Sequence, residues 1–157
     1  FIKIPPGQAR LVRAACLLHD VSWRAHPDFR AEVCFEYATR ANLGGLSHEE
    51  RVFLGLALLH RYRNKRDGTR FRELFELLSA NHQKDAEVLG KAMRLGAMLW
   101  ANPDDETAQL CWLPKKKSLS LTLTAQASPL FGEVAEARLH ALAQALNATT
   151  RVDMKLT

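Results

Sequence analysis

The longest nonpolar stretch of the chain is residues 52–59, eight positions in a row without a polar side chain. It follows Ser47-His48-Glu49-Glu50, in which a serine precedes a glutamate by three residues. This spacing is typical of a capping box, because each of the two side chains accepts a hydrogen bond from an unpaired backbone N–H at the start of a helix. The pattern predicts a helix that is buried on nearly every side and ends at His60.

Nonpolar residues at three- and four-residue spacing predict further helices on both sides of this one. We expect these helices over residues 8–19, 27–42, 70–78 and 84–100. In the first of them, Val12, Cys16 and His19 share one face beside Leu11, Ala15 and Leu18, so that His19 ends a buried stripe. Two histidines, His19 and His60, would then each lie at the carboxyl end of a buried helix face.

The spacing of nonpolar residues changes after residue 108. Residues 118–124 alternate polar and nonpolar without interruption, which predicts a half-buried strand, and residues 109–113 and 151–156 predict two more. Between them, Ser128-Pro129 is expected to begin a helix that buries Val134. Helices followed by the order β-β-α-β predict an α+β fold that is mainly α, with a helical domain at 1–103 and a small subdomain at 104–157.

Positive charge is concentrated in one segment. Residues 61–72 hold six basic residues and one acid, and their charge of +5 equals the formal net charge of the whole chain. A solvated loop explains such a segment, but forked guanidinium donors also suit phosphate oxygens. The candidate phosphate contacts are Arg61, Arg63, Lys65, Arg66 and Arg70, with Lys115, Lys116 and Lys117 as a second group.

A second candidate chemistry is metal binding. His19-Asp20 offers one nitrogen and one oxygen ligand to a divalent cation, and His26 and His60 are further imidazoles. The alternative is that His19 and His60 satisfy the backbone groups at their helix ends. Both interpretations stay open at this point.

Other features narrow the class of protein. Cys16, Cys34 and Cys111 lack metal-ligand spacing and are expected to be reduced core residues of a cytoplasmic protein. No nonpolar run approaches the roughly 18 residues of a membrane span. The chain opens on Phe1 without an initiator Met, so we expect a fragment of a longer protein.

Four features occur in order along the chain: the run from Ala14 to Asp28, the segment His60-Arg61-Tyr62-Arg63, the segment Met93-Arg94-Leu95-Gly96-Ala97, and the final β-β-α-β pattern. Together they resemble the carboxyl-terminal domain of the exopolyphosphatase and guanosine-pentaphosphate phosphohydrolase family, in which the helical part is HD-like. The resemblance covers nearly the whole chain.

The resemblance implies catalytic amino-terminal actin-like domains, absent here, that hydrolyse terminal phosphates of polyphosphate or guanosine pentaphosphate with Mg²⁺. It implies that the present domain contributes a polyanion-binding surface and a homodimer interface, with no catalytic residue and no cofactor of its own. Working HD enzymes place a final Asp in an Arg-Leu-Ala-Asp-like run, where this chain has Ala97. His19, Asp20, His26 and His60 would then be a degenerate remnant that holds no metal.

Two alternatives remain. One is an autonomous HD-type metal-dependent phosphohydrolase acting on a nucleotide, which needs three protein ligands and an open position. The other is a nucleic-acid-binding module. The basic segment contains only two aromatic residues, Tyr62 and Phe71, which are too few for a base-stacking surface and argue against this alternative.

Overall fold

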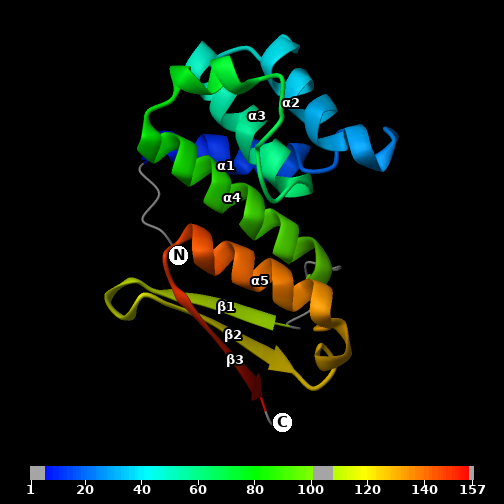
Figure 1. Ribbon diagram of the computed structural model, residues 1–157, viewed down its shortest axis with the longest axis vertical. Coiled ribbons are helices and arrows are strands. Elements are labelled where there is room, and N and C mark those ends of the chain that lie inside the picture. Colours follow the sequence, from blue (N-terminus) through cyan, green and yellow to red (C-terminus); the bar gives the residue numbers. More distant parts are fainter. Residues whose placement is uncertain (1–5, 101–107, 156–157) are drawn as a thin grey trace. The chain divides into compact units, whose positions relative to one another are not determined.

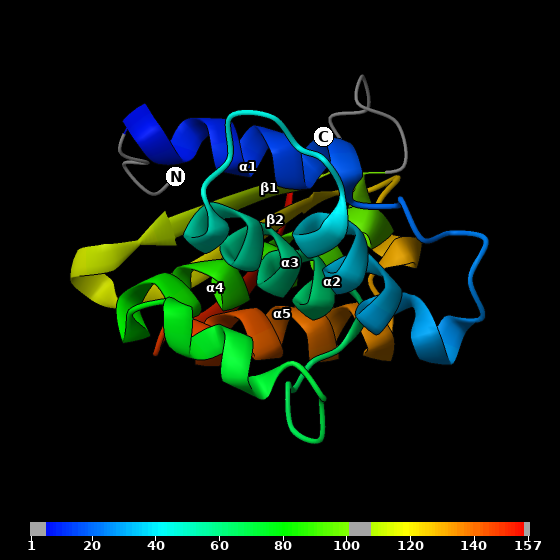
Figure 2. The same cartoon turned by 90° about the horizontal axis from the view of Figure 1, so that it is seen from above.

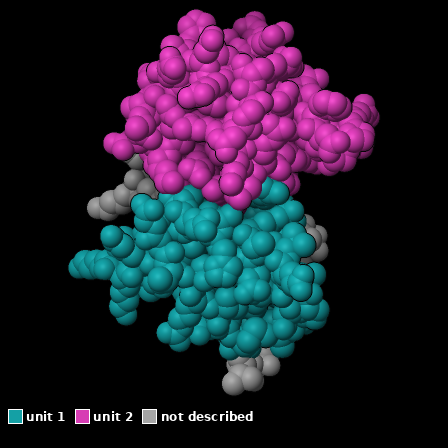
Figure 3. Space-filling model, in the orientation of Figure 1, with its two compact units in different colours: residues 1–3, 94–157 teal, residues 4–93 magenta. Residues whose placement is uncertain are grey.

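A computed structural model describes residues 6–100 and 108–155 of the chain. It divides the chain into two compact units, one formed by residues 4–93 and the other by residues 94–157 with 1–3 (Figure 3). The expected domain boundary after residue 103 falls outside the described residues and stays a prediction. The mainly helical α+β fold is confirmed (Figure 1).

The first unit is helical. Its elements in chain order are α1 (Pro6–Leu18), the 3-10 helix η1 (Pro27–Phe29), α2 (Arg30–Arg40), α3 (His48–Tyr62), the 3-10 helix η2 (Arg72–Leu77) and the first part of α4 (Ala80–Leu99). Helices α2 and α3 lie side by side (Figure 2). Every element that the sequence predicted in this unit is present, with ends that differ by a few residues.

Helix α3 forms the centre of this unit. All residues from Val52 to His60 are buried, as predicted, and the capping box between Ser47 and Glu50 is present with both of its hydrogen bonds. The helix continues to Tyr62, two residues beyond the predicted end at His60. The extension has a physical cause, since the Tyr62 ring packs against the core and its hydroxyl is hydrogen-bonded.

The first helix is rotated relative to the prediction. Leu11 and Ala15 are buried and Leu18 packs against the core, whereas Leu17 is 78% exposed. Cys16 and His19 are exposed as well, so the prediction that they continue the buried stripe was wrong. Spacings of three and four residues from Leu11 and Ala15 reach Leu18, but Cys16 lies roughly 100° from Ala15 around the helix.

Only one of the three cysteines is a core residue. Cys34 on α2 is buried, and burial raises the pKa of its thiol above the usual value, while its sulfur lies 3.0 Å from the Ser22 hydroxyl. Cys16 and Cys111 are exposed, which corrects the expectation that all three lie in the core. In β1 the residues alternate between the two faces of the sheet, and Cys111 falls on the more exposed face.

The second unit combines the end of α4 with a sheet. Its strands are β1 (Ala108–Leu113), β2 (Ser118–Thr124) and β3 (Thr149–Lys155), and its helix is α5 (Glu133–Ala145), with short 3-10 turns η3 (Pro114–Lys116) and η4 (Ser128–Leu130). The sheet order is β1-β2-β3, antiparallel between β1 and β2 and parallel between β2 and β3. The predicted β-β-α-β order and the half-buried strand at 118–124 are confirmed.

Helix α5 differs from its prediction in start and orientation. Ser128-Pro129 begins η4, and α5 starts only after Gly132. Leu142 and Ala145 are buried as expected, but Val134 is 58% exposed and Leu139 is buried, which corrects the predicted face in the first part of the helix. None of the described helices is long and nonpolar enough to cross a membrane.

Helix α4 approaches α3 closely at Gly90. A Cβ atom added there would lie 2.3 Å from the carbonyl oxygen of Ala57 and 2.5 Å from Cβ of His60. Backbone oxygen cannot move away cheaply, because it belongs to a buried helix. Glycine at this position therefore sets the distance between the two helices.

We expect Gly90→Ala to lower the free energy of unfolding by about 1–3 kcal/mol, because the added methyl group overpacks the contact with α3. Urea denaturation measures the change. Gly96→Ala in the same helix is the matched control, since its Cβ would meet only Trp100 at 3.8 Å. The control should be neutral or stabilise by up to about 1 kcal/mol through helix propensity, and equal losses in both variants would contradict the close approach at Gly90.

Candidate functional site

The His-Asp pair lies in the turn that follows α1. Both His19 and Asp20 are exposed. Nδ1 of His19 lies 2.8 Å from the carbonyl oxygen of Cys16, and because a carbonyl only accepts, Nδ1 carries the proton in this contact. His19 thus satisfies a backbone group at the end of α1, which is one of the two roles that the sequence left open.

Asp20 is hydrogen-bonded to the last residue of α3, Tyr62. The Tyr62 hydroxyl donates to Oδ1 of Asp20 at 2.8 Å and lies 3.1 Å from the carbonyl oxygen of His19. Burial, followed by the hydrogen bond to Asp20, raises the pKa of Tyr62 to about 12, so the phenol stays protonated and remains a donor. The carboxylate therefore joins the turn after α1 to α3.

The other two imidazoles lie in different surroundings. His60 is 3% exposed, and its Nδ1 lies 3.3 Å from the carbonyl oxygen of Arg63. His26 is exposed beside Asp28, with 3.6 Å between Nδ1 and Oδ2. Within residues 6–100 and 108–155, no three His, Cys, Asp or Glu side chains gather closely enough to hold a metal ion. Ala97 is exposed on α4.

Burial dominates the chemistry of His60. It lowers the pKa of this imidazole from 6.5 to about 4, and Glu87 on α4 opposes the change only in part. The nearby cations Lys91 and Arg66 act in the same direction as burial. Lys91 is itself buried and bonded to Glu87, with 2.6 Å between Nζ and Oε1. His60 is therefore neutral at physiological pH.

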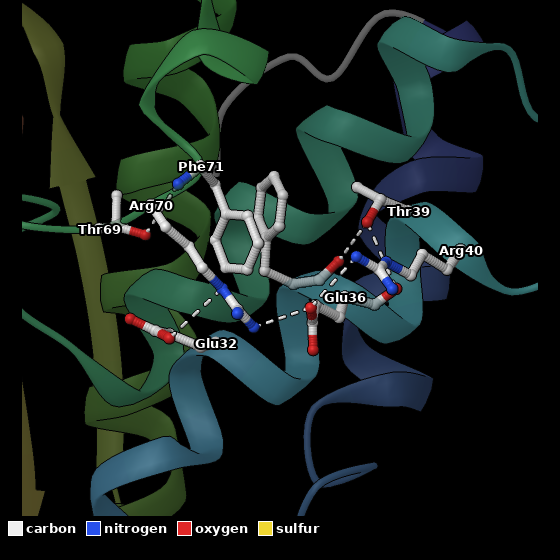
Figure 4. Close-up of polar contacts among 8 residues, drawn as sticks. Glu32, Glu36, Thr39, Arg40, Thr69, Arg70 and Phe71 are labelled. Carbon is white, nitrogen blue, oxygen red and sulfur yellow. Dashed lines mark hydrogen bonds and ion pairs between the residues drawn. The ribbon is translucent and has the colours of Figure 1, made fainter.

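The basic segment is partly neutralised by two acids of α2. Oε1 of Glu36 accepts from Nη2 of Arg70 at 2.8 Å, and Oε2 of Glu32 lies 3.8 Å from Nε of Arg70 (Figure 4). Oε1 of Glu32 also lies 3.7 Å from Nη1 of Arg63. Arg40 completes the group at 3.5 Å from Glu36. Two of the five predicted phosphate contacts, Arg63 and Arg70, are thus paired within the chain, which the charge of the segment alone did not indicate.

The same segment is anchored on the aromatic core. The guanidinium of Arg70 lies over the ring of Phe71 at 5.0 Å, and Phe71 stacks on Phe35 of α2 at a centroid distance of 4.4 Å. The guanidinium of Arg61 lies over Tyr62 at 4.9 Å, and its Nε is buried. Cation–π contacts place both guanidinium groups over aromatic rings of the helical unit, while the Arg70 side chain stays 62% exposed.

Arg66 and Arg72 border a pocket of about 410 Å³ between the basic segment, η2 and the start of α4. Its lining residues are Arg66, Asp67, Gly68, Thr69, Arg72, Phe75, Glu76 and Gln83. Arg66 donates through Nη1 to Oε1 of Gln83 at 2.5 Å, and Gln83 in turn donates to the carbonyl oxygens of Phe75 and Leu78 at 2.8 and 3.0 Å. The guanidinium of Arg66 is therefore held in place by a neutral partner.

The five predicted contacts thus fall into separate groups. Arg63 and Arg70 pair with acids of α2, Arg61 lies against Tyr62, and Arg66 borders the pocket beside the exposed Lys65. Lys115, Lys116 and Lys117 are exposed between β1 and β2, in the other compact unit. The structure does not test whether any of these residues binds phosphate.

Sequence reasoning missed the partners of the basic residues. Glu32, Glu36 and Arg40 follow one another at four-residue spacing on α2, a signal that one helix face carries charge, but nothing local relates it to residues some 30 positions later. Arg72 and Gln83 were also missed as pocket residues. Only the way the segment folds back between α2 and α4 brings these groups together.

A comparison with protein-family models gives one match. The model described as "Exopolyphosphatase, C-terminal" matches residues 4–153. A search of curated proteins found no match. A helical unit followed by a β-β-α-β unit defines an α+β domain, and the match shows which one: the chain belongs to the exopolyphosphatase carboxyl-terminal domain family. Membership supports a hydrolase as the parent protein.

The depressed pKa of His60 predicts how stability depends on pH. The unfolded chain takes up the proton near pH 6.5 and the folded chain only near pH 4, so stability is complete above pH 6.5 and falls between pH 6.5 and 4. The loss from this residue amounts to roughly 3 kcal/mol. Urea denaturation of His60→Asn should show a much weaker pH dependence over this window.

His48→Asn is the control, because His48 is exposed at the start of the same helix. It should leave the pH profile of the wild-type protein unchanged. An identical profile in His60→Asn would show that His60 does not titrate with a lowered pKa.

Tyr62→Phe should lower the free energy of unfolding by about 1–2 kcal/mol, because it removes the donor to Asp20 and to the carbonyl of His19. Tyr37→Phe on α2 is the matched control, since Tyr37 is 55% exposed. Equal stability of both variants in urea denaturation would show that the bond between α3 and the turn contributes nothing.

Proposed function

We propose that this chain is an accessory carboxyl-terminal domain of an exopolyphosphatase-type phosphohydrolase. Its role is to bind polyanion and to form a homodimer, while hydrolysis of terminal phosphate from polyphosphate or guanosine pentaphosphate belongs to amino-terminal catalytic domains of the same chain. The observation that carries this proposal is the pocket beside Lys65 and Arg66, in a domain whose family is that of exopolyphosphatases.

The geometry favours Lys65 and Arg66 as the main polyanion contacts. Arg66 is bonded to the neutral Gln83, so it keeps its full charge, whereas Arg63 and Arg70 face the carboxylates of Glu32 and Glu36. A phosphate chain carries about one charge per phosphate, and unpaired cations attract it most strongly. Arg61, Arg63 and Arg70 remain secondary contacts, with Lys115 to Lys117 as a separate candidate group.

The pocket itself favours an elongated ligand that extends past it. Its lining contains two arginines, Arg66 and Arg72, and two acids, Asp67 and Glu76. These four charges cancel, so the pocket alone offers little to an isolated phosphate ion. A polyphosphate that also passes over the exposed Lys65 meets a net positive surface.

The proposal extends to the setting of the domain. Mg²⁺ is an expectation for the catalytic domains that follows from the family resemblance. A cytoplasmic location also remains part of the proposal.

An autonomous HD-type metal hydrolase is the alternative in a different class. It would need His19 and Asp20 together with a third ligand, yet Asp20 is bonded to Tyr62 and His60 is bonded to the carbonyl of Arg63. Neither contact supports a ligand set. The test is elemental analysis of the purified chain, in which about one metal ion per chain, lost in Asp20→Ala, would replace our proposal by this alternative.

We expect Lys65→Ala/Arg66→Ala to weaken binding of long-chain polyphosphate by at least about tenfold at low salt, because two unpaired cations are removed. The slope of log affinity against log salt should also decrease. Fluorescence anisotropy with end-labelled polyphosphate measures both quantities.

Arg13→Ala/Arg24→Ala is the matched control. It removes the same charge from exposed residues of α1 and the following turn, outside the basic segment. Equal weakening in both double variants would mean that net charge alone determines binding. Unchanged affinity in Lys65→Ala/Arg66→Ala would rule out the proposed contact surface.

A further inference from the structure

Strand β3 is an edge strand with one side unpaired by any other strand of the described chain. It lies last in the order β1-β2-β3 and pairs with β2 alone. The N–H of Thr149 donates to the carbonyl oxygen of Lys117 at the start of β2. Because backbone groups alternate in direction along a strand, Arg151 and Asp153 also point their N–H and C=O toward β2, while those of Thr150, Val152 and Met154 point outward.

The side chains of β3 are also unusual for a free edge. Val152 is paired in register with the buried Leu121, yet it is 41% exposed, and Met154 on the same face is 50% exposed. The opposite face carries Arg151 and Asp153, which are bonded to each other at 2.8 Å between Nε and Oδ2. One face of the edge therefore exposes Val152 and Met154, and the other carries Arg151, Asp153 and Lys155.

This order of residues is complementary to itself. If two copies of β3 pair antiparallel about Val152, Arg151 of each copy lies opposite Asp153 of the other, and Val152 lies opposite its own counterpart. Moving the centre by one residue in either direction on the strand would place Arg151 opposite Arg151, or Asp153 opposite Asp153, and like charges directly opposite destabilise a pair. Charge therefore favours the register about Val152 over these two neighbouring registers.

The direction of the backbone groups agrees with this register. Val152 opposite Val152, and Thr150 opposite Met154, become hydrogen-bonded pairs, because their N–H and C=O groups point outward. Arg151 and Asp153 then form non-hydrogen-bonded pairs, in which the Cα atoms lie closer, at about 4.5 Å, so that opposite charges come together. On the opposite face of the sheet, Val152 would pack against Val152 of the second copy, and Met154 against Thr150 of the second copy.

We propose that β3 is the dimerisation strand of this chain, and that its partner is β3 of a second copy, paired antiparallel about Val152 into one continuous sheet. This inference rests on the proposed dimeric state and names the surface that forms it. A two-fold axis through Val152 makes the contact isologous and closed, since each copy contributes once the edge that no described strand pairs. The alternative is that the charges only protect the edge from pairing.

The first test is a charge exchange. Arg151→Asp places acids opposite acids and should weaken the dimer by roughly tenfold or more in sedimentation equilibrium. The double variant Arg151→Asp/Asp153→Arg restores opposite charges across the two-fold axis and should return the dimerisation constant to near that of the wild-type chain. Recovery by the second change separates pairing from a loss of folding in the first.

The second test fixes the register with a disulfide. In a Cys16→Ser/Cys111→Ser background, which removes the exposed thiols, Val152→Cys should form an interchain disulfide on mild oxidation, because opposite residues of an antiparallel pair lie within about 6 Å. Thr150→Cys is the control. In this register position 150 faces Met154 of the second copy, so the two copies of position 150 lie four residues apart along the strands, about 13 Å, and should not cross-link.

The outcomes separate this inference from the proposed function. If the chain dimerises with a constant that Arg151→Asp does not change, and Val152→Cys does not cross-link, the β3 interface is wrong but the proposed dimeric state is retained. A chain that stays monomeric at every concentration, with or without Arg151→Asp, would overturn both and leave the charges as protection of the edge. Polyphosphate binding at Lys65 and Arg66 is measured separately and is unaffected by either result.

Discussion

The helical unit depends on the burial of α3 from Val52 to His60. A helix without an exposed face must be covered on every side, and here α1, α2 and η2 pack on it while α4 approaches it at Gly90. Because the buried stretch continues through its last turn, the polar groups there need partners inside the protein. His60 meets the carbonyl of Arg63, and Tyr62 meets Asp20.

This arrangement determines how the basic segment is presented. The segment leaves the end of α3 and returns over α2, where Phe71 stacks on Phe35 and Arg70 reaches Glu36. Arg63 and Arg70 form ion pairs with acids of α2, whereas Arg66 is hydrogen-bonded to the neutral Gln83 of α4 and Lys65 is exposed. A charge count by sequence window treats these residues as equal, but their contacts make only some of them available to an anionic ligand.

The features that the sequence predicted well are those with local causes. The capping box at Ser47 and the strand at 118–124 depend on spacing within a few residues, and both match the structure. The rotation of α1 and the late start of α5 after Gly132 were mispredicted, because several nonpolar faces are compatible with each helix and tertiary packing selects one. The pairing of Arg70 with Glu36 joins distant segments, which no local pattern encodes.

The His-Asp pair shows how a ligand-type motif can serve the fold. His19 donates from Nδ1 to the carbonyl of Cys16, and Asp20 accepts from a phenol that stays protonated up to about pH 12. Each group satisfies a neighbour at the junction of α1 and α3. Asp20 thus has a structural reason to be an acid even where it binds no metal, because it accepts the hydrogen bond of Tyr62 at the end of the buried helix.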